Sequence, residues 1–166
     1  MKKAPIKRTE YIVPLSRDHH AGLLFCWKIK EGVRKNIPGE RILAYVNFFS
    51  EQHLRPHFRE EEALLFSRID DDLCRRGKTE HRMLEERIIQ LNRRGAQAQE
   101  YLSFAELLSN HIRFEERVLF PYLEATLPPA TLKQVGEYLS AQHPAAYVDN
   151  YKDAFWAKTN SLEPGV

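Results

Sequence analysis

The chain has little of what disulfide frameworks, membrane spans and nucleic-acid-binding surfaces require. Its two cysteines, Cys26 and Cys74, lie far apart and form no Cys-x-x-Cys motif, which favours two structural thiols in a reducing, cytoplasmic setting. No stretch approaches the roughly 20 apolar residues that a membrane-spanning helix needs. The formal net charge is only +2, so electrostatics give no reason to expect nucleic acid as a partner.

The beginning of the chain also lacks a targeting pattern. Its basic segment, MKKAPIKR, has no apolar run behind it, so we expect no secretory signal peptide. The 166 residues, of which 43% are hydrophobic, are enough to bury one core, and we expect a single domain over residues 1–166. Glycine is sparse and strand-like alternation is weak, which favours helices.

Apolar residues recur at intervals of three to four in blocks that proline and glycine separate. Four amphipathic helices with such connections form an antiparallel up-down-up-down bundle, so the predicted class is an all-α four-helix bundle. We expect the bundle core over about 12–125 and a C-terminal extension over 126–166 whose aromatic tail docks on the bundle. The predicted helices cover about 16–33, 40–69, 80–94 (with Thr79 as a cap) and 97–125, followed by a short helix over 130–143.

The second helix carries a proline among charged residues, in EQHLRPHFREEE at positions 51–62. Pro56 cannot donate to the carbonyl of Gln52, so it should interrupt the helix. Our hypothesis is that the interruption lies beside a metal site, where the binding of metal compensates for it.

An internal repeat divides the chain into two helical hairpins. Residues 57–66 read HFREEEALLF and residues 111–120 read HIRFEERVLF, with six of the ten positions identical. A shorter echo relates DHH at 18–20 to EHR at 80–82. Each half therefore offers a histidine early in its first helix and a His-x-x-x-Glu pair late in its second.

These residues are predicted to meet at one end of the bundle. Residues four apart lie on the same helix face, so each His-x-x-x-Glu pair can aim a nitrogen and a carboxylate at one point. Nitrogen and oxygen ligands without thiolate favour iron, manganese or zinc over an iron–sulfur cluster. Four imidazoles and two carboxylates exceed the four ligands of a structural zinc, and they suggest two metals bridged by the two glutamates.

This pattern resembles the hemerythrin-like (HHE cation-binding) family over roughly residues 12–125. The resemblance implies a non-haem di-iron centre, bridged by an oxo or hydroxo group, inside a four-helix bundle. It is carried by LSRDHHAGL, HFREEEALLF, EHRML and HIRFEERVLFPYLE. The metal ligands that it implies are His19, His57, Glu61, His81, His111 and Glu115.

The chain departs from the oxygen-carrying members of that family at two positions. They have a second histidine four residues after the one on the third helix, where this chain has Glu85, and they end with a His-x-x-x-x-Asp pair. With only four histidines, both irons keep an open position. We therefore expect a protein that binds or senses oxygen, nitric oxide or iron, rather than a simple oxygen carrier or an enzyme. The alternatives are a di-iron redox enzyme acting on peroxide or nitric oxide, or a helper in iron handling or iron–sulfur repair.

The sequence leaves the roles of several other side chains undecided. His20 competes with His19 as a ligand. His53 is an alternative ligand that we expect instead to contact the ligands or belong to the core, and Glu85 is either an additional ligand or a solvated charge. His143 has no partner in the pattern. Three further glutamates are expected to face solvent or to pair with Arg59 and Arg113. They are Glu60, Glu62 and Glu116.

Overall fold

The computed structural model describes residues 8–93 and 95–158, and these residues contain helices but no strand. The all-α prediction is therefore confirmed, while most of the basic segment at the start lies outside the described residues. None of the described helices is long and apolar enough to cross a membrane. The helices are α1 (Val13–Arg34), α2 (Gly39–Phe49), the π-helix η1 (Ser50–Leu54), α3 (Arg55–Leu64), the 3₁₀-helix η2 (Phe66–Arg68), α4 (Asp72–Arg93), α5 (Ala98–Phe114), the π-helix η3 (Glu115–Leu119), α6 (Phe120–Thr126) and α7 (Pro129–Gln142).

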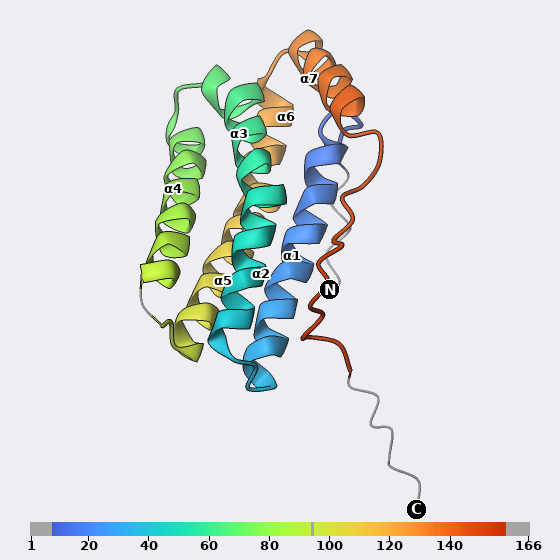
Figure 1. Cartoon of the computed structure of the whole chain (residues 1–166). Helices are drawn as coiled ribbons and strands as arrows, with labels where there is room; N and C mark the ends of the chain where they lie inside the picture. Colours follow the sequence, from blue (N-terminus) through green and yellow to red (C-terminus); the bar gives the residue numbers. More distant parts are fainter. Residues whose placement is uncertain (1–7, 94, 159–166) are drawn as a thin grey trace, which may run out of the picture.

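The long helices lie side by side (Figure 1). In that view α1 and α4 run downward, α2 with α3 runs upward, and α5 with α6 also runs upward, while α7 lies across the top. α1 packs along α5, and α4 packs along both α5 and α2. The start of α1, α3, the start of α4 and the end of α5 are therefore at a similar height.

The polar residues of interest separate two groups of buried apolar side chains. On α1, His19 lies between Leu15 of a smaller cluster and Cys26 of a larger one, and the same order recurs around His81 on α4. The larger cluster includes Phe25, Ile29, Tyr45, Phe49, Leu84, Phe104 and Leu108, and the smaller one includes Ile12, Leu65, Phe66, Leu119, Phe120 and Leu139.

The prediction that the third helix begins after Thr79 was wrong. α4 begins at Asp72, and the side chain of Asp71 accepts a hydrogen bond of 2.9 Å from the amide of Cys74 in its first turn. Gly77 suggested a loop, but it lies within the helix. The residue is glycine because a Cβ there would come within 3.0 Å of both Phe66 and Leu119. The glycine permits close packing of α4 against its neighbours.

Both helices that carry a His-x-x-x-Glu pair contain a π-helical turn followed by a proline. η1 precedes Pro56, and the amide of Arg55 donates to the carbonyl of Ser50, five residues earlier. η3 precedes Pro121 in the same way. The expected interruption at Pro56 thus takes the form of a π turn, which accommodates a residue without an amide donor and commonly occurs at functional sites.

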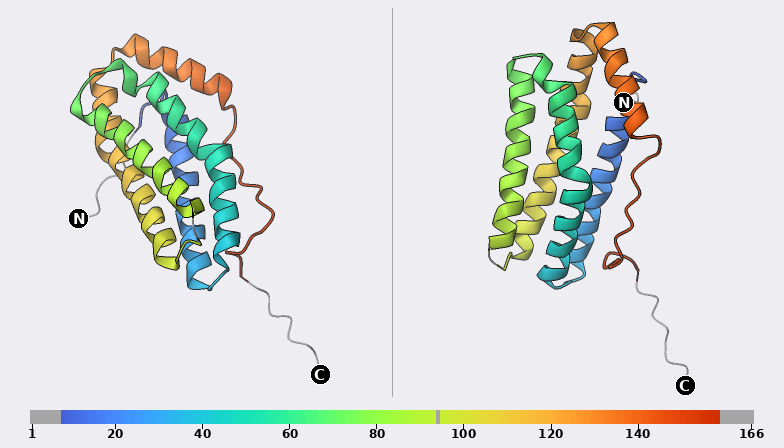
Figure 2. Two further views of the ribbon diagram at one scale, coloured as in Figure 1. Left: turned by 60° about the vertical axis from the view of Figure 1, so that its left-hand side comes forward. Right: turned by 45° about the horizontal axis from the view of Figure 1, so that its top comes forward.

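The segment after α7 returns along the bundle, as both views in Figure 2 show. Tyr147, Tyr151 and Trp156 pack against the larger apolar cluster, and Phe155 is buried in it. Asp149 accepts a hydrogen bond of 2.9 Å from the buried Lys28 of α1. The predicted docking of the aromatic tail is confirmed, and the tail completes the chain's own core.

Candidate metal centre

The six predicted ligands are brought together from the neighbouring helices, and all six are buried. They form two groups of four, and within each group one ligand atom per residue lies within 4.8 Å of the others. The first group contains His19 and His57, the second contains His81 and His111, and both contain the same two glutamates, Glu61 and Glu115.

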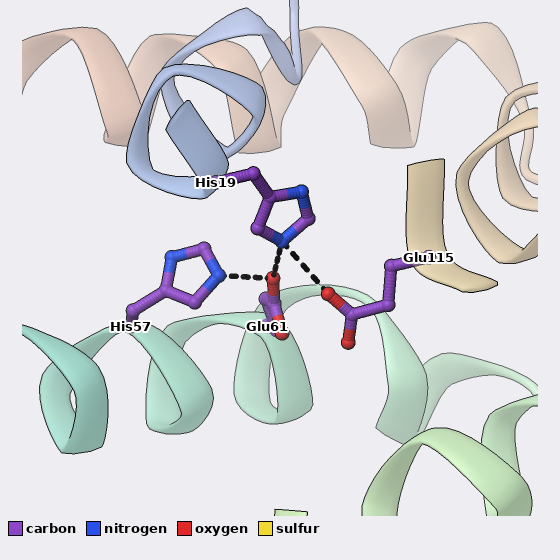
Figure 3. Close-up of side chains that lie close together, drawn as sticks. All are labelled: His19, His57, Glu61 and Glu115. Carbon is purple, nitrogen blue, oxygen red and sulfur yellow. Dashed lines mark hydrogen bonds and ion pairs between the residues drawn. The ribbon is translucent and has the colours of Figure 1, made fainter. Parts of the chain in front are cut away.

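Glu61 divides its two oxygens between the groups. Its Oε1 lies next to Nε2 of His57 and 3.1 Å from Nε2 of His19 (Figure 3), whereas its Oε2 lies 3.1 Å from Nε2 of His81. One carboxylate is therefore shared between the two halves of the site.

Glu115 divides its oxygens in the complementary way. Its Oε2 lies 2.8 Å from Nε2 of His19, as Figure 3 also shows, whereas its Oε1 lies 2.7 Å from Nε2 of His111 and 3.2 Å from Nε2 of His81. Each of these carboxylates could therefore offer an oxygen to both pairs of imidazoles.

Four atoms at the centre are buried without a hydrogen-bond partner of suitable geometry within the described part of the chain. They are Nε2 of His57 and of His111, and Oε2 of Glu61 and of Glu115. Buried polar atoms are nearly always paired, because an unpaired one costs about 1–3 kcal/mol. A cation coordinated by these atoms would satisfy them, so the donor set fits a metal.

The other ring nitrogen of each histidine contacts a carboxylate from a neighbouring helix. Nδ1 of His19 lies 2.7 Å from Glu116, and Nδ1 of His81 lies 2.7 Å from Glu62. These two glutamates were expected to face solvent or to pair with Arg59 and Arg113. Glu62 is partly exposed, but both carboxylates contact a histidine of the centre, and Glu116 also contacts Arg8. Such a carboxylate fixes the tautomer and the orientation of a metal-binding imidazole.

The remaining two histidines have equivalent partners, which the sequence reasoning missed. Nδ1 of His57 lies 3.0 Å from Asp18, and Nδ1 of His111 lies 3.1 Å from Glu80. A signal existed, since these acids directly precede the histidines at 19 and 81. Likewise, Glu62 directly follows Glu61, and Glu116 directly follows Glu115.

The carboxylates of the site favour protonated imidazoles, and the imidazoles favour ionised carboxylates. Burial alone would lower the pKa of His57, but Glu61 and Asp18 outweigh it and raise the pKa to about 9. Burial alone would raise the pKa of Glu115, but His111 and its neighbours hold it well below its ordinary value. A metal cation requires deprotonated ligands, so it would take the place of these protons.

The three alternative residues lie outside both groups. His20 is exposed and Glu85 is half-buried, and neither belongs to a cluster that could hold a metal in the described residues. His53 is buried one turn before His57, and its ring stacks on that histidine at a centroid distance of 6.1 Å. The geometry therefore favours His19 over His20 at the centre.

A small cavity of about 10 Å³ adjoins the centre. Its polar wall includes His19 and His57, and its apolar wall includes Gly22, Leu54 and Ile112. Such a volume accommodates about one molecule of the size of water.

The comparisons with known proteins agree with this chemistry. The model of the family described as "Hemerythrin HHE cation binding domain" matches residues 15–129, a span that contains all six central residues. Comparison with curated proteins and with solved structures gave no significant match. α7 and the docked tail lie almost entirely beyond the matched span.

Proposed function

The chain belongs to the hemerythrin HHE cation-binding domain family, and from this premise we propose that it is a non-haem di-iron protein that binds or senses oxygen or nitric oxide. The observation that carries the proposal is the sharing of Glu61 and Glu115 between two pairs of buried histidines. Two iron ions, bridged by an oxo or hydroxo group, would use all six ligands, whereas a single zinc would use four.

The chain's own residues would act as a rigid, water-poor holder. His19 and His57 would hold one iron and His81 and His111 the other, with each imidazole oriented through its second nitrogen by a carboxylate. When bound, the iron pair supplies an open coordination position and reversible one-electron chemistry. The small cavity beside His19 and His57 supports a ligand of diatomic size at that position.

The fold and setting are part of the proposal. We infer one hemerythrin-like domain with the up-down-up-down order of four helices that the sequence predicts, completed by the C-terminal segment. The two free, buried thiols, Cys26 and Cys74, support a reducing, cytoplasmic setting.

The test combines metal analysis with absorbance spectroscopy. The protein, loaded with iron(II) without air and freed of excess metal, should hold two irons per chain and gain near-ultraviolet charge-transfer bands on oxidation. The reduced protein should change its spectrum with nitric oxide in a saturable way, with one event per chain. A single zinc per chain and no spectral response would contradict the proposal. Many turnovers with peroxide or nitric oxide would instead favour the redox-enzyme alternative.

A further inference from the structure

An outer pocket of about 150 Å³ lies next to the small cavity at the centre. Its walls come from η1 and α3 and from the segment after α7, including Glu60, His143, Ala145 and Tyr147. Nε2 of His143 lies 2.7 Å from the carboxylate of Glu60, so this histidine does have a partner. The pocket is therefore built partly by residues beyond the span that the family model matches.

Three residues line both hollows and form the wall between them: Asp18, His53 and His57. Asp18 and His57 hold each other through a bond of 3.0 Å. His53 has a weaker attachment, since its Nε2 lies 3.4 Å from the carbonyl oxygen of Asp18. Of these three residues, His53 thus has the longest hydrogen bond within the wall.

Tyr147 covers His53 from the outside. The two rings lie 4.1 Å apart between centroids, and the half-buried Tyr147 has a hydroxyl without a hydrogen-bond partner in the described residues. His53 itself lies in the π-helix η1, a departure from regular helix that commonly marks functional sites. The tail thus places an aromatic ring against the most weakly held side chain of the wall.

We propose that the outer pocket is the entrance to the metal centre and that His53 and Tyr147 form its gate. This inference rests on the proposed function. Two carboxylates, of Asp18 and Glu60, line the outer pocket, which disfavours anions. The inner cavity has room for about one water-sized molecule, so the gate selects a small, neutral molecule such as a diatomic gas.

The first experiment measures how fast nitric oxide reacts with the iron-loaded, reduced protein. Tyr147→Ala removes the outer ring and should raise the second-order rate constant at least about threefold, because the gate opens more often. Ala145→Trp narrows the outer pocket and should lower the rate constant by a similar factor. Tyr151→Ala is the matched control, since Tyr151 packs on Tyr45 and Phe48 in the same tail but outside the pocket.

A second readout does not depend on iron. In the zinc-loaded protein, labelling of His53 by diethyl pyrocarbonate, located by mass spectrometry, should become faster with Tyr147→Ala and slower with Ala145→Trp. The reaction of the exposed His20 serves as the reference in every variant.

The outcomes separate the two proposals. If the rate constant for nitric oxide is the same in all variants while His53 labelling changes, the ligand reaches the metal elsewhere and the entrance is wrong, although the di-iron proposal stands. If Tyr151→Ala raises the rate constant as much as Tyr147→Ala does, undocking of the tail explains the effect and the gate is wrong. If the unchanged, iron-loaded protein does not respond to nitric oxide, the proposed function itself is wrong.

Discussion

The two halves of the chain bring the same residues to the centre but surround them differently. The ring of His81 stacks between Phe58 and Phe66, at centroid distances of 4.0 and 5.6 Å. Around His19 the corresponding Phe120 is present at 5.1 Å, but the repeat has Ile112 where the first half has Phe58.

The small cavity lies beside this smaller side chain, although Phe58 and His111 also line it. A Cβ on Gly22 would lie 2.8 Å from Cδ1 of Ile112, and these two residues line the small cavity. The contacts outside the centre also differ, because Glu116 is held by Arg8 and Ser16, whereas Glu62 is partly exposed. The six residues of the centre are thus equivalent in the two halves, but their surroundings differ. On the proposed function, we expect a small ligand to bind on the side of His19 and His57.

Removing a shared glutamate should abolish the distinction between the halves. Glu115→Ala takes one oxygen from each metal group, so both metals should bind at least about 100-fold more weakly, because it removes a ligand rather than an outer contact. The measurement is the iron content after anaerobic loading and gel filtration. Glu85→Ala, outside both groups, should retain two irons, and retention of one full iron by the Glu115 variant would show that the glutamate is not shared.

Glu116 and Glu62, which contact Nδ1 of His19 and of His81, test whether the histidines of the two halves are held equally well. Glu116→Ala removes a group that contacts His19 and leaves the buried guanidinium of Arg8 with fewer partners, so metal affinity should fall about 10- to 100-fold. Glu62→Ala should cost only a few-fold, because water can reach the nitrogen of His81 that it exposes. Competition with a coloured chelator measures both affinities. Equal losses would remove the claimed difference in support.

Filling the small cavity should make the surroundings of His19 and His57 as closely packed as those of His81 and His111. Gly22→Ala pushes Ile112 toward a space of about 10 Å³, so binding of nitric oxide should weaken about tenfold, which corresponds to 1.4 kcal/mol. The iron content should stay at two. Gly95→Ala, where a Cβ meets nothing within 4 Å, is the matched control. Unchanged ligand affinity in the Gly22 variant would mean that the ligand does not use this cavity.

A smaller effect concerns pH. The pKa of His57 is raised to about 9 in the metal-free protein, whereas the pKa of this histidine in the unfolded chain is about 6.5. The stabilisation from its protonation is therefore complete below pH 6.5 and is lost as the pH rises through 9. The free energy of unfolding of the metal-free protein should therefore fall between pH 7 and 9, and His57→Gln should flatten this dependence. Urea titrations at both pH values measure it, and an increase in stability over that interval would contradict the assignment.

The sequence predicted the helical class and the meeting of the six central residues because both follow from short-range spacing and from the repeat. The contacts between each histidine and its outer carboxylate join different helices, so spacing along one helix does not reveal them. The start of α4 was missed because Gly77 and the surrounding charges resemble a loop, and only the packing of Phe66 and Leu119 explains the glycine. The difference between Phe58 and Ile112 was visible in the repeat, but its consequence for the cavity required the structure.

The most direct test of the account is a crystal structure of the iron-loaded protein with anomalous diffraction measured at the iron absorption edge. The account predicts two iron peaks per chain, one among His19, His57 and both glutamates and the other among His81, His111 and both glutamates, with Glu61 and Glu115 spanning the pair. A single peak, or iron bound away from these two glutamates, would contradict it.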